Sequence, residues 1–168
     1  GSRAIIVDAV YDEVTSKVLE LAEKITIGAT DNGADVYLGP VVDKKAMKTI
    51  MDYIEIGKSE GKLLLGGERH QTTENGYFIQ PTIFGDVDPE ARIAKEEIFG
   101  PVLAMIRAKD FEDALNIANN TDYGLTGAVY SNNRQHLEQA RCELHVGNLY
   151  LNRKCTGALV GVHPFGGF

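Results

Sequence analysis

Short apolar runs that alternate with helically spaced apolar residues dominate the sequence and limit what the chain can fold into. Residues 4–7 form a β-branched run typical of a strand. The segment behind it predicts a helix, whose apolar stripe comprises Val10, Val14, Val18, Leu21 and Ile25. Strand and helix patterns in alternation are typical of βαβ units. The sequence therefore predicts an α/β fold with a largely parallel sheet.

Two aspartates follow loop-like segments and are expected to cap helices. Asp43 follows a Gly-, Asp- and Asn-rich loop at 28–40, and Gly57 and Gly61 are expected to bracket the end of its helix. The inward residues of that helix are expected to be Ala46, Met47, Ile50, Met51 and Ile54. The helix after Asp110 is expected to turn inward Phe111, Ala114, Leu115 and Ala118.

The remaining apolar runs predict strands. Residues 101–108 form the most continuous run and predict a buried strand, and two further strands are expected at 127–130 and 148–151, with a helix at about 132–142 between them. The turn dipeptide Asn75-Gly76 precedes a candidate strand at 77–83. Pro81 cannot donate a ladder hydrogen bond, so this strand is expected at a sheet edge or a bulge.

Composition excludes several functional classes. The formal charge of −7 opposes binding to phosphate backbones, so nucleic acid is not an expected partner. No apolar run reaches the roughly 18 residues of a membrane helix, so no span is expected. Cys142 and Cys155 are too few for a disulfide framework, and no cysteine or histidine spacing predicts a metal site. A reducing, cytoplasmic compartment fits best, and 168 residues suit a single domain.

The chain ends suggest a piece of a larger protein. The sequence begins inside a predicted strand and stops in the apolar segment 164–168, which further chain would normally cover. We therefore expect a fragment.

The most specific segment is Glu96-Glu97-Ile98-Phe99-Gly100-Pro101, which directly precedes the most buried predicted strand. By itself it could be a solvated acidic turn. It resembles a motif of the aldehyde dehydrogenase superfamily, however, and segments 76–82, 122–129, 147–152 and 164–167 resemble other superfamily segments in the same order. The resemblance covers essentially the whole chain. It implies a three-layer α/β/α catalytic-domain fold, truncated here to residues 1–168, without the NAD-binding domain, the nucleophilic cysteine or the C-terminal oligomerisation arm.

The resemblance also implies a cofactor contact. In the family the second acid of the motif hydrogen-bonds hydroxyls of the nicotinamide ribose of NAD, and the aromatic residue two positions later packs beside that ribose. These roles fall to Glu97 and Phe99. A carboxylate suits this role, because it accepts two hydroxyl hydrogen bonds and its charge strengthens them.

Segment 152–161 resembles the 1-pyrroline-5-carboxylate dehydrogenase branch, which oxidises glutamate γ-semialdehyde to glutamate in proline and arginine catabolism. The resemblance implies that the backbone N–H groups of Gly157 and Ala158 hold the substrate carboxylate, and that Phe165 packs on its aliphatic stem. Consecutive backbone donors in a tight turn can form such an anion site. Without the resemblance, a plain glycine turn followed by a core phenylalanine would be the simpler interpretation.

In the family a cysteine thiolate attacks the aldehyde, hydride passes to NAD, and water activated by a glutamate releases the acid. The nucleophile of this family lies just upstream of a Ser-Arg pair that resembles Ser2-Arg3, so it would precede this chain.

Cys155 has Arg153 and Lys154 beside it, which could suggest a reactive thiolate, but it is expected to be a loop residue near the site. We expect no catalytic residue in the chain, no activity of the chain alone and no retained NAD, within a parent that forms a homo-oligomer.

Two alternatives stay open at this point. The parent could be another aldehyde dehydrogenase, acting on succinate semialdehyde or aliphatic aldehydes. Alternatively, the chain could be a stand-alone binding module without catalysis.

Overall fold

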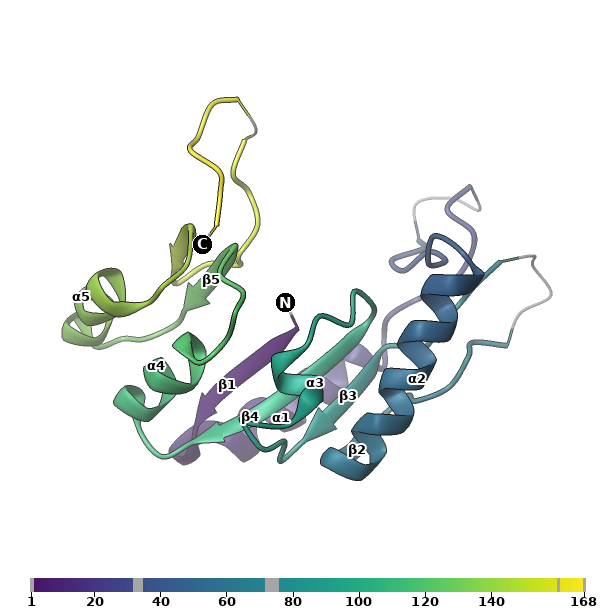
Figure 1. The fold of residues 1–168 in the computed structure, drawn as a ribbon, viewed down its shortest axis with the longest axis horizontal. Coiled ribbons are helices and arrows are strands. Elements are labelled where there is room, and N and C mark those ends of the chain that lie inside the picture. Colours follow the sequence, from purple (N-terminus) through teal and green to yellow (C-terminus); the bar gives the residue numbers. More distant parts are fainter. Residues whose placement is uncertain (1, 32–34, 72–75, 160, 168) are drawn as a thin grey trace. The chain divides into compact units, whose positions relative to one another are not determined.

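The computed structural model describes residues 2–31, 35–71, 76–159 and 161–167 (Figure 1). Of the sequence features discussed above, residues 32–34 of the predicted loop, Asn75, Val160 and Phe168 lie outside these ranges. The chain divides into two compact units, residues 1–107 and 108–168, and each is described by itself. The elements in order are β1 Arg3–Val7, α1 Asp8–Ala22, α2 Lys44–Glu60, β2 Lys62–Leu65, β3 Thr82–Gly85, α3 Arg92–Lys95, β4 Val102–Ala108, α4 Phe111–Asn119, β5 Thr126–Val129, α5 Arg134–Glu143 and β6 Asn148–Leu151.

The first unit is built on a four-stranded sheet in the order β1-β4-β3-β2. Strands β3 and β4 pair in parallel, with Thr82 opposite Val102 and Phe84 opposite Ala104. Strand β2 pairs antiparallel with β3 and carries an irregularity between Leu63 and Leu65. The predicted α/β class and the buried strand near 101–108 are confirmed.

Helices cover both faces of this sheet. Neighbouring residues of a strand point to opposite faces, so one strand can pack on both helix layers. Ile83 packs with Tyr11 and Met105 in a cluster that includes residues of α1. The next residue, Phe84, lies on the other face, where Gly57 of α2 approaches its ring. The unit therefore has three layers, with α1 behind the sheet and α2 in front of it in Figure 1.

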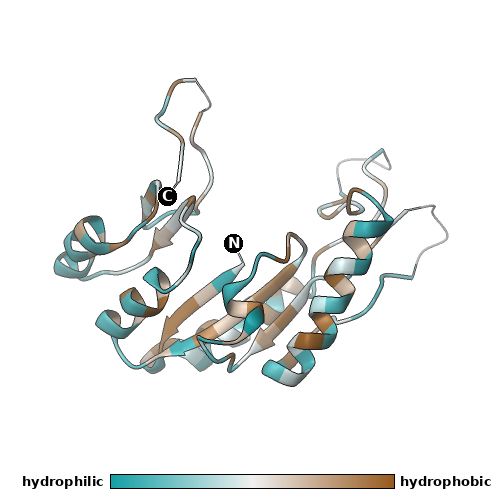
Figure 2. Cartoon of the chain, viewed as in Figure 1, coloured by the Kyte–Doolittle hydropathy of each residue, from teal (hydrophilic) through white to brown (hydrophobic). Residues whose placement is uncertain are grey.

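The distribution of hydropathy follows these layers. Hydrophobic residues gather on the strands and on the inward side of α2, whereas the outer turns of α2 are hydrophilic (Figure 2). Met47, Ile50 and Ile54 are buried as predicted. Asp43 caps the helix by accepting the Ala46 N–H at 2.6 Å, and Gly61 ends it. Gly57 lies inside the helix against Phe84 and does not mark its end.

Two expectations about unit 1 are wrong. The strand predicted at 77–83 begins only at Thr82 and lies inside the sheet between β4 and β2. Pro81 is compatible with this position because it stands just before the strand, where no ladder N–H is needed. The inward stripe of α1 also differs in part: Val18 packs on the core cluster as predicted and Tyr11 is buried, whereas Val10 and Leu21 are 41 % and 66 % exposed.

The second unit contains a separate two-stranded sheet and two helices. Strands β5 and β6 pair in parallel from Thr126 opposite Asn148 to Val129 opposite Leu151, close to the predicted bounds. Asp110 caps α4 as predicted, accepting the Asp113 N–H at 2.9 Å. The ring of Phe111 on α4 stacks on that of His136 on α5, with 4.2 Å between ring centroids.

The Tyr11 hydroxyl joins α1 to the sheet of the first unit. It donates to the Met105 carbonyl at 3.3 Å and accepts the Asp86 N–H at 2.7 Å, while the Arg107 guanidinium lies 3.9 Å from the ring centroid. Asp86 has a φ of 50°, a conformation that few non-glycine residues adopt. The hydroxyl therefore satisfies a backbone group at a strained turn.

We predict that Tyr11→Phe lowers the free energy of unfolding by about 1–3 kcal/mol, because the Asp86 N–H loses the hydroxyl that accepts its hydrogen bond, while the Met105 carbonyl keeps the Val87 N–H and the packed ring remains. Urea denaturation measures the difference. Tyr37→Phe is the matched control, because Tyr37 is 81 % exposed and its change should stay within about 0.5 kcal/mol. Equal stabilities of the Tyr11 and Tyr37 variants would contradict the assigned role.

Candidate functional site

A hollow of about 500 Å³ in the first unit contains both predicted cofactor residues. Its walls are the start of α2 and the segment between α3 and β4. The lining residues are Val41, Val42, Asp43, Lys45, Ala46, Thr49, Ile50, Glu97, Ile98 and Phe99. Glu97 and Phe99 thus line the same hollow.

The exposed Glu97 carboxylate suits the binding of sugar hydroxyls. Within the ranges that the structure describes, no hydrogen bond or ion pair engages this carboxylate, so both oxygens can accept. Its neighbour Ile98 is buried and anchors this segment in the core. The donor and acceptor chemistry of this hollow therefore fits a ribose diol of NAD.

Phe99 projects from the segment in a strained backbone conformation. Its φ is 56° and its side chain is 87 % exposed. A bulky residue in the left-handed region costs roughly 1–3 kcal/mol and persists only where the surroundings impose it. The next residue is Gly100, where a Cβ would lie 2.7 Å from the Ile50 side chain. Close packing at Gly100 therefore holds the chain directly after Phe99, which lines the hollow with a largely exposed side chain.

Sequence reasoning missed the role of Glu96, the first acid of the motif. Arg92 donates to its two oxygens at 2.8 and 2.9 Å, and the Tyr53 hydroxyl donates at 2.6 Å. The Arg92 hydrogen bonds, followed by that of Tyr53, lower the pKa of Glu96 to about 2. The same contact with Glu96 raises the pKa of Tyr53. The helical spacing of Arg92 and Glu96 was the one available signal, since residues i and i+4 are neighbours on a helix.

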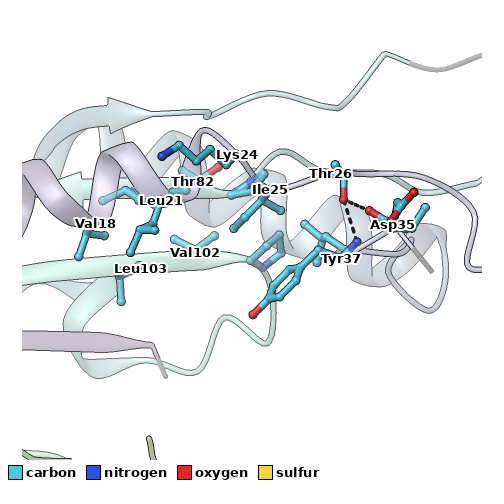
Figure 3. Close-up of a pocket in the computed structure, with 17 residues that line it drawn as sticks. Val18, Leu21, Lys24, Ile25, Thr26, Asp35, Tyr37, Thr82, Val102 and Leu103 are labelled. Carbon is cyan, nitrogen blue, oxygen red and sulfur yellow. Dashed lines mark hydrogen bonds between the residues drawn. The ribbon is translucent and has the colours of Figure 1, made fainter.

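A larger hollow of about 1010 Å³ lies elsewhere in the first unit (Figure 3). It is bounded by the end of α1, segment 35–38 and the starts of β3 and β4, and most of its lining residues are apolar. The Thr26 hydroxyl bonds the Asp35 carbonyl and the Tyr37 N–H at its rim. Neither Glu97 nor Phe99 lines it, so both predicted cofactor residues belong to the smaller hollow.

The predicted carboxylate-binding turn belongs to the second unit, after β6. Gly157 has a φ of 123°, which residues with a side chain rarely adopt, and a Cβ there would lie 2.8 Å from the Arg153 guanidinium. The Ala158 N–H donates to the Tyr150 hydroxyl at 3.1 Å. Arg153 lies over the Tyr150 ring, 5.4 Å from its centroid. One of the two predicted donors therefore has a protein partner, and a guanidinium lies beside the turn.

Phe165 also lies in this second unit and is 52 % exposed, so it is not a core residue. The carbonyl of Pro164 accepts a hydrogen bond from the Asn148 side chain at 2.8 Å, which ties the segment to β6. His163 has a structural contact, accepting the Leu159 N–H at 3.0 Å. Cys155 is partly buried in the same loop.

The five predicted site residues thus fall into two groups. Glu97 and Phe99 share a hollow of unit 1, and Gly157, Ala158 and Phe165 share a loop of unit 2. Among the described residues, acidic, histidine and cysteine side chains form no group of three or more suited to a metal ion. In the same ranges, no helix has the length and apolar character needed to cross a bilayer.

Comparison with known proteins identifies the class. Residues 1–168 match the model of the aldehyde dehydrogenase family, so the chain belongs to this family. It is 62 % identical over its whole length to 1-pyrroline-5-carboxylate dehydrogenase 1 of Halalkalibacterium halodurans and 58 % identical to 1-pyrroline-5-carboxylate dehydrogenase 2 of Bacillus subtilis. The chain spans 32 % of the length of each of these relatives.

A solved structure gives the same result. The 1-pyrroline-5-carboxylate dehydrogenase from Thermus with bound NAD matches the whole chain with a TM-score of 0.94 and 57 % identity, over 32 % of that protein. The expected resemblance, the α/β class and the mostly parallel pairing are confirmed.

The Glu96 contacts predict an acid-dependent stability. The pKa of Glu96 is about 2 in the folded chain against an ordinary value of 4.5, so its ion pair stabilises the fold fully above about pH 4.5. This contribution is lost as the pH falls toward 2. We expect the difference in urea midpoint between the natural protein and Glu96→Gln to shrink from pH 7 to pH 3. A difference that stays constant over this range would show that the carboxylate is not held in its ionised form.

Proposed function

We propose that the whole protein is an NAD-dependent 1-pyrroline-5-carboxylate dehydrogenase that oxidises L-glutamate γ-semialdehyde to glutamate. The observation that carries this proposal is the Glu97 carboxylate, which has no partner among the residues that the structure describes and shares its hollow with the exposed Phe99 ring. The identity of 57–62 % to dehydrogenases of this name, over the whole chain, supports the choice of substrate.

Glu97 and Phe99 are the residues that would hold the cofactor. The carboxylate would accept hydrogen bonds from the ribose hydroxyls, and the aromatic ring would limit the positions of the sugar. Bound NAD supplies the hydride acceptor for the oxidation. This chain contributes orientation of the cofactor, while the nucleophile and the water-activating glutamate belong to other parts of the protein.

Gly157, Ala158 and Phe165 are the residues proposed to bind the aldehyde. The turn at 157–158 offers backbone N–H groups, and the Arg153 guanidinium beside it adds positive charge, which favours a carboxylate. Because the Ala158 N–H donates to Tyr150, a bound carboxylate would share or replace the Tyr150 hydroxyl as its acceptor. The half-exposed Phe165 ring offers an apolar surface to the substrate stem.

Two broader expectations belong to this proposal. The protein would work in the cytoplasm, which agrees with two cysteines that form no disulfide in the chain. It would assemble as a homo-oligomer, with the small-molecule aldehyde as its other partner.

The substrate assignment is tested with the full-length protein. We expect kcat/KM with NAD to be at least about tenfold higher for glutamate semialdehyde than for succinate semialdehyde or hexanal, because only the first presents its carboxylate at the matching distance from the aldehyde. NADH formation at 340 nm measures the rates. The isolated chain 1–168, assayed in parallel, should give no turnover. Preference for hexanal would overturn the assignment of the substrate.

The cofactor contact is tested by Glu97→Gln in the full-length protein. Loss of the charge-assisted hydrogen bonds should raise the KM for NAD by roughly 10- to 100-fold and leave the KM for the aldehyde nearly unchanged. Glu55→Gln is the matched control, because Glu55 is an exposed acid that pairs with Lys58 and does not line the hollow. An unchanged KM for NAD would remove Glu97 from the cofactor site.

A further inference from the structure

We propose that Glu96 is a positioning residue for the cofactor site: together with Tyr53 and Arg92 it fixes the segment that presents Glu97 and Phe99. The inference rests on the proposed NAD site and adds the means by which that site is held in place.

The first element of this arrangement is a three-donor contact. Arg92 uses Nε and one terminal nitrogen on the two oxygens of Glu96, and Tyr53 donates to the second oxygen. The Arg92 guanidinium also lies over the Tyr53 ring, 5.7 Å from its centroid. Because three donors converge on two oxygens, only a carboxylate can satisfy them all.

The contact joins two different elements of the first unit. Tyr53 belongs to α2, whereas Arg92 and Glu96 are the first residue and the C-cap of the one-turn helix α3. The other end of α3 is held by the same partner helix, because the Glu60 carboxylate accepts the Ile93 N–H at 3.0 Å. Helix α3 is therefore attached to α2 at both of its ends.

A second contact with α2 follows the cofactor residues. Gly100 packs so closely on Ile50 that a Cβ would lie 2.7 Å from that side chain. The segment 97–99 is thus bounded by Tyr53–Glu96 on one side and Ile50–Gly100 on the other. Within these bounds Ile98 is buried, while Glu97 and Phe99 are exposed.

Helix α2 also forms the opposite wall of the hollow, where Lys45 and Thr49 lie. Because one rigid helix holds the segment at both ends and lines the site, it sets the distance between the Glu97 carboxylate and the facing wall. A displacement of about 1 Å in such a site can cost up to about 100-fold in rate or binding. Weakening the Glu96 contact should therefore act on NAD binding, although Glu96 does not line the hollow.

Glu96→Gln in the full-length protein tests the inference. Glutamine has the same shape but replaces one acceptor oxygen with a donor, so it cannot satisfy Arg92 and Tyr53 together. We expect the Kd for NAD, measured by calorimetry, to rise roughly tenfold, and kcat at saturating NAD to stay within about twofold. Tyr53→Phe should give a smaller rise, and the double variant should show less than the sum of the two effects.

Controls separate this role from a general loss of folding. Glu55→Gln, on the same helix as Tyr53 and in an exposed ion pair, should leave the Kd for NAD unchanged. Glu96→Asp keeps the charge and should bind NAD better than Glu96→Gln. A purely structural role would instead lower the active fraction of Glu96→Gln while active molecules keep the natural Kd, and that result would overturn the inference.

The outcomes also distinguish this inference from the proposed function. If the natural protein fails to bind NAD, the proposed function falls and the positioning role falls with it. If the natural protein binds NAD and Glu96→Gln binds equally well, only the positioning role is overturned. Amide hydrogen exchange gives an independent check, because residues 97–100 should exchange faster in Glu96→Gln than in Glu55→Gln.

Discussion

The start of β4 is fixed by its parallel pairing with β3, and the geometry of residues 96–100 depends on that pairing. The Thr82 N–H donates to the Pro101 carbonyl at 2.8 Å, so the ladder begins at a residue that can accept a hydrogen bond but cannot donate one. The chain must therefore leave the sheet just before Pro101. This exit places residues 96–100 outside the sheet, next to the start of α2.

Helix α2 is the second support of this arrangement. One side of it packs on the sheet through Ile50, Ile54 and Gly57, and its neighbouring positions contact α3 and line the hollow. Since its Asp43 cap and its Gly61 end are both defined, its length and position relative to β3 are set by local sequence. The same helix thus connects the buried core of the unit to the exposed Glu97 and Phe99.

Local patterns in the sequence predicted much of this architecture. The caps at Asp43 and Asp110 and the strands at 102–108 and 148–151 follow from residue types within a few positions. The place of β3 within the sheet could not be predicted in this way. Pro81 favours an edge strand only if it lies inside the strand, and the sequence did not show that the strand begins one residue later, at Thr82. The stripe of α1 differs in part because the core buries Tyr11, which is not among the residues predicted for it.

The site shows the same division. The predictions for Glu97, Phe99 and the turn at 157–158 rest on continuous motifs in the sequence. The contact of Glu96 with Tyr53 joins residues 43 positions apart, and the Tyr150 hydroxyl bonds a backbone N–H eight positions away. Such contacts depend on the tertiary fold, and a single sequence motif cannot predict them.

The backbone of Phe99 has a consequence for attempts to engineer the protein. A phenylalanine in a left-handed conformation with its ring in solvent weakens the fold at that position, where glycine or asparagine would be tolerated more easily. Selection in the laboratory for heat resistance alone would thus tend to discard the ring. Thermal stability and ligand affinity therefore make opposite demands on residue 99. A stabilised variant should be chosen by measuring its stability and its ligand affinity together.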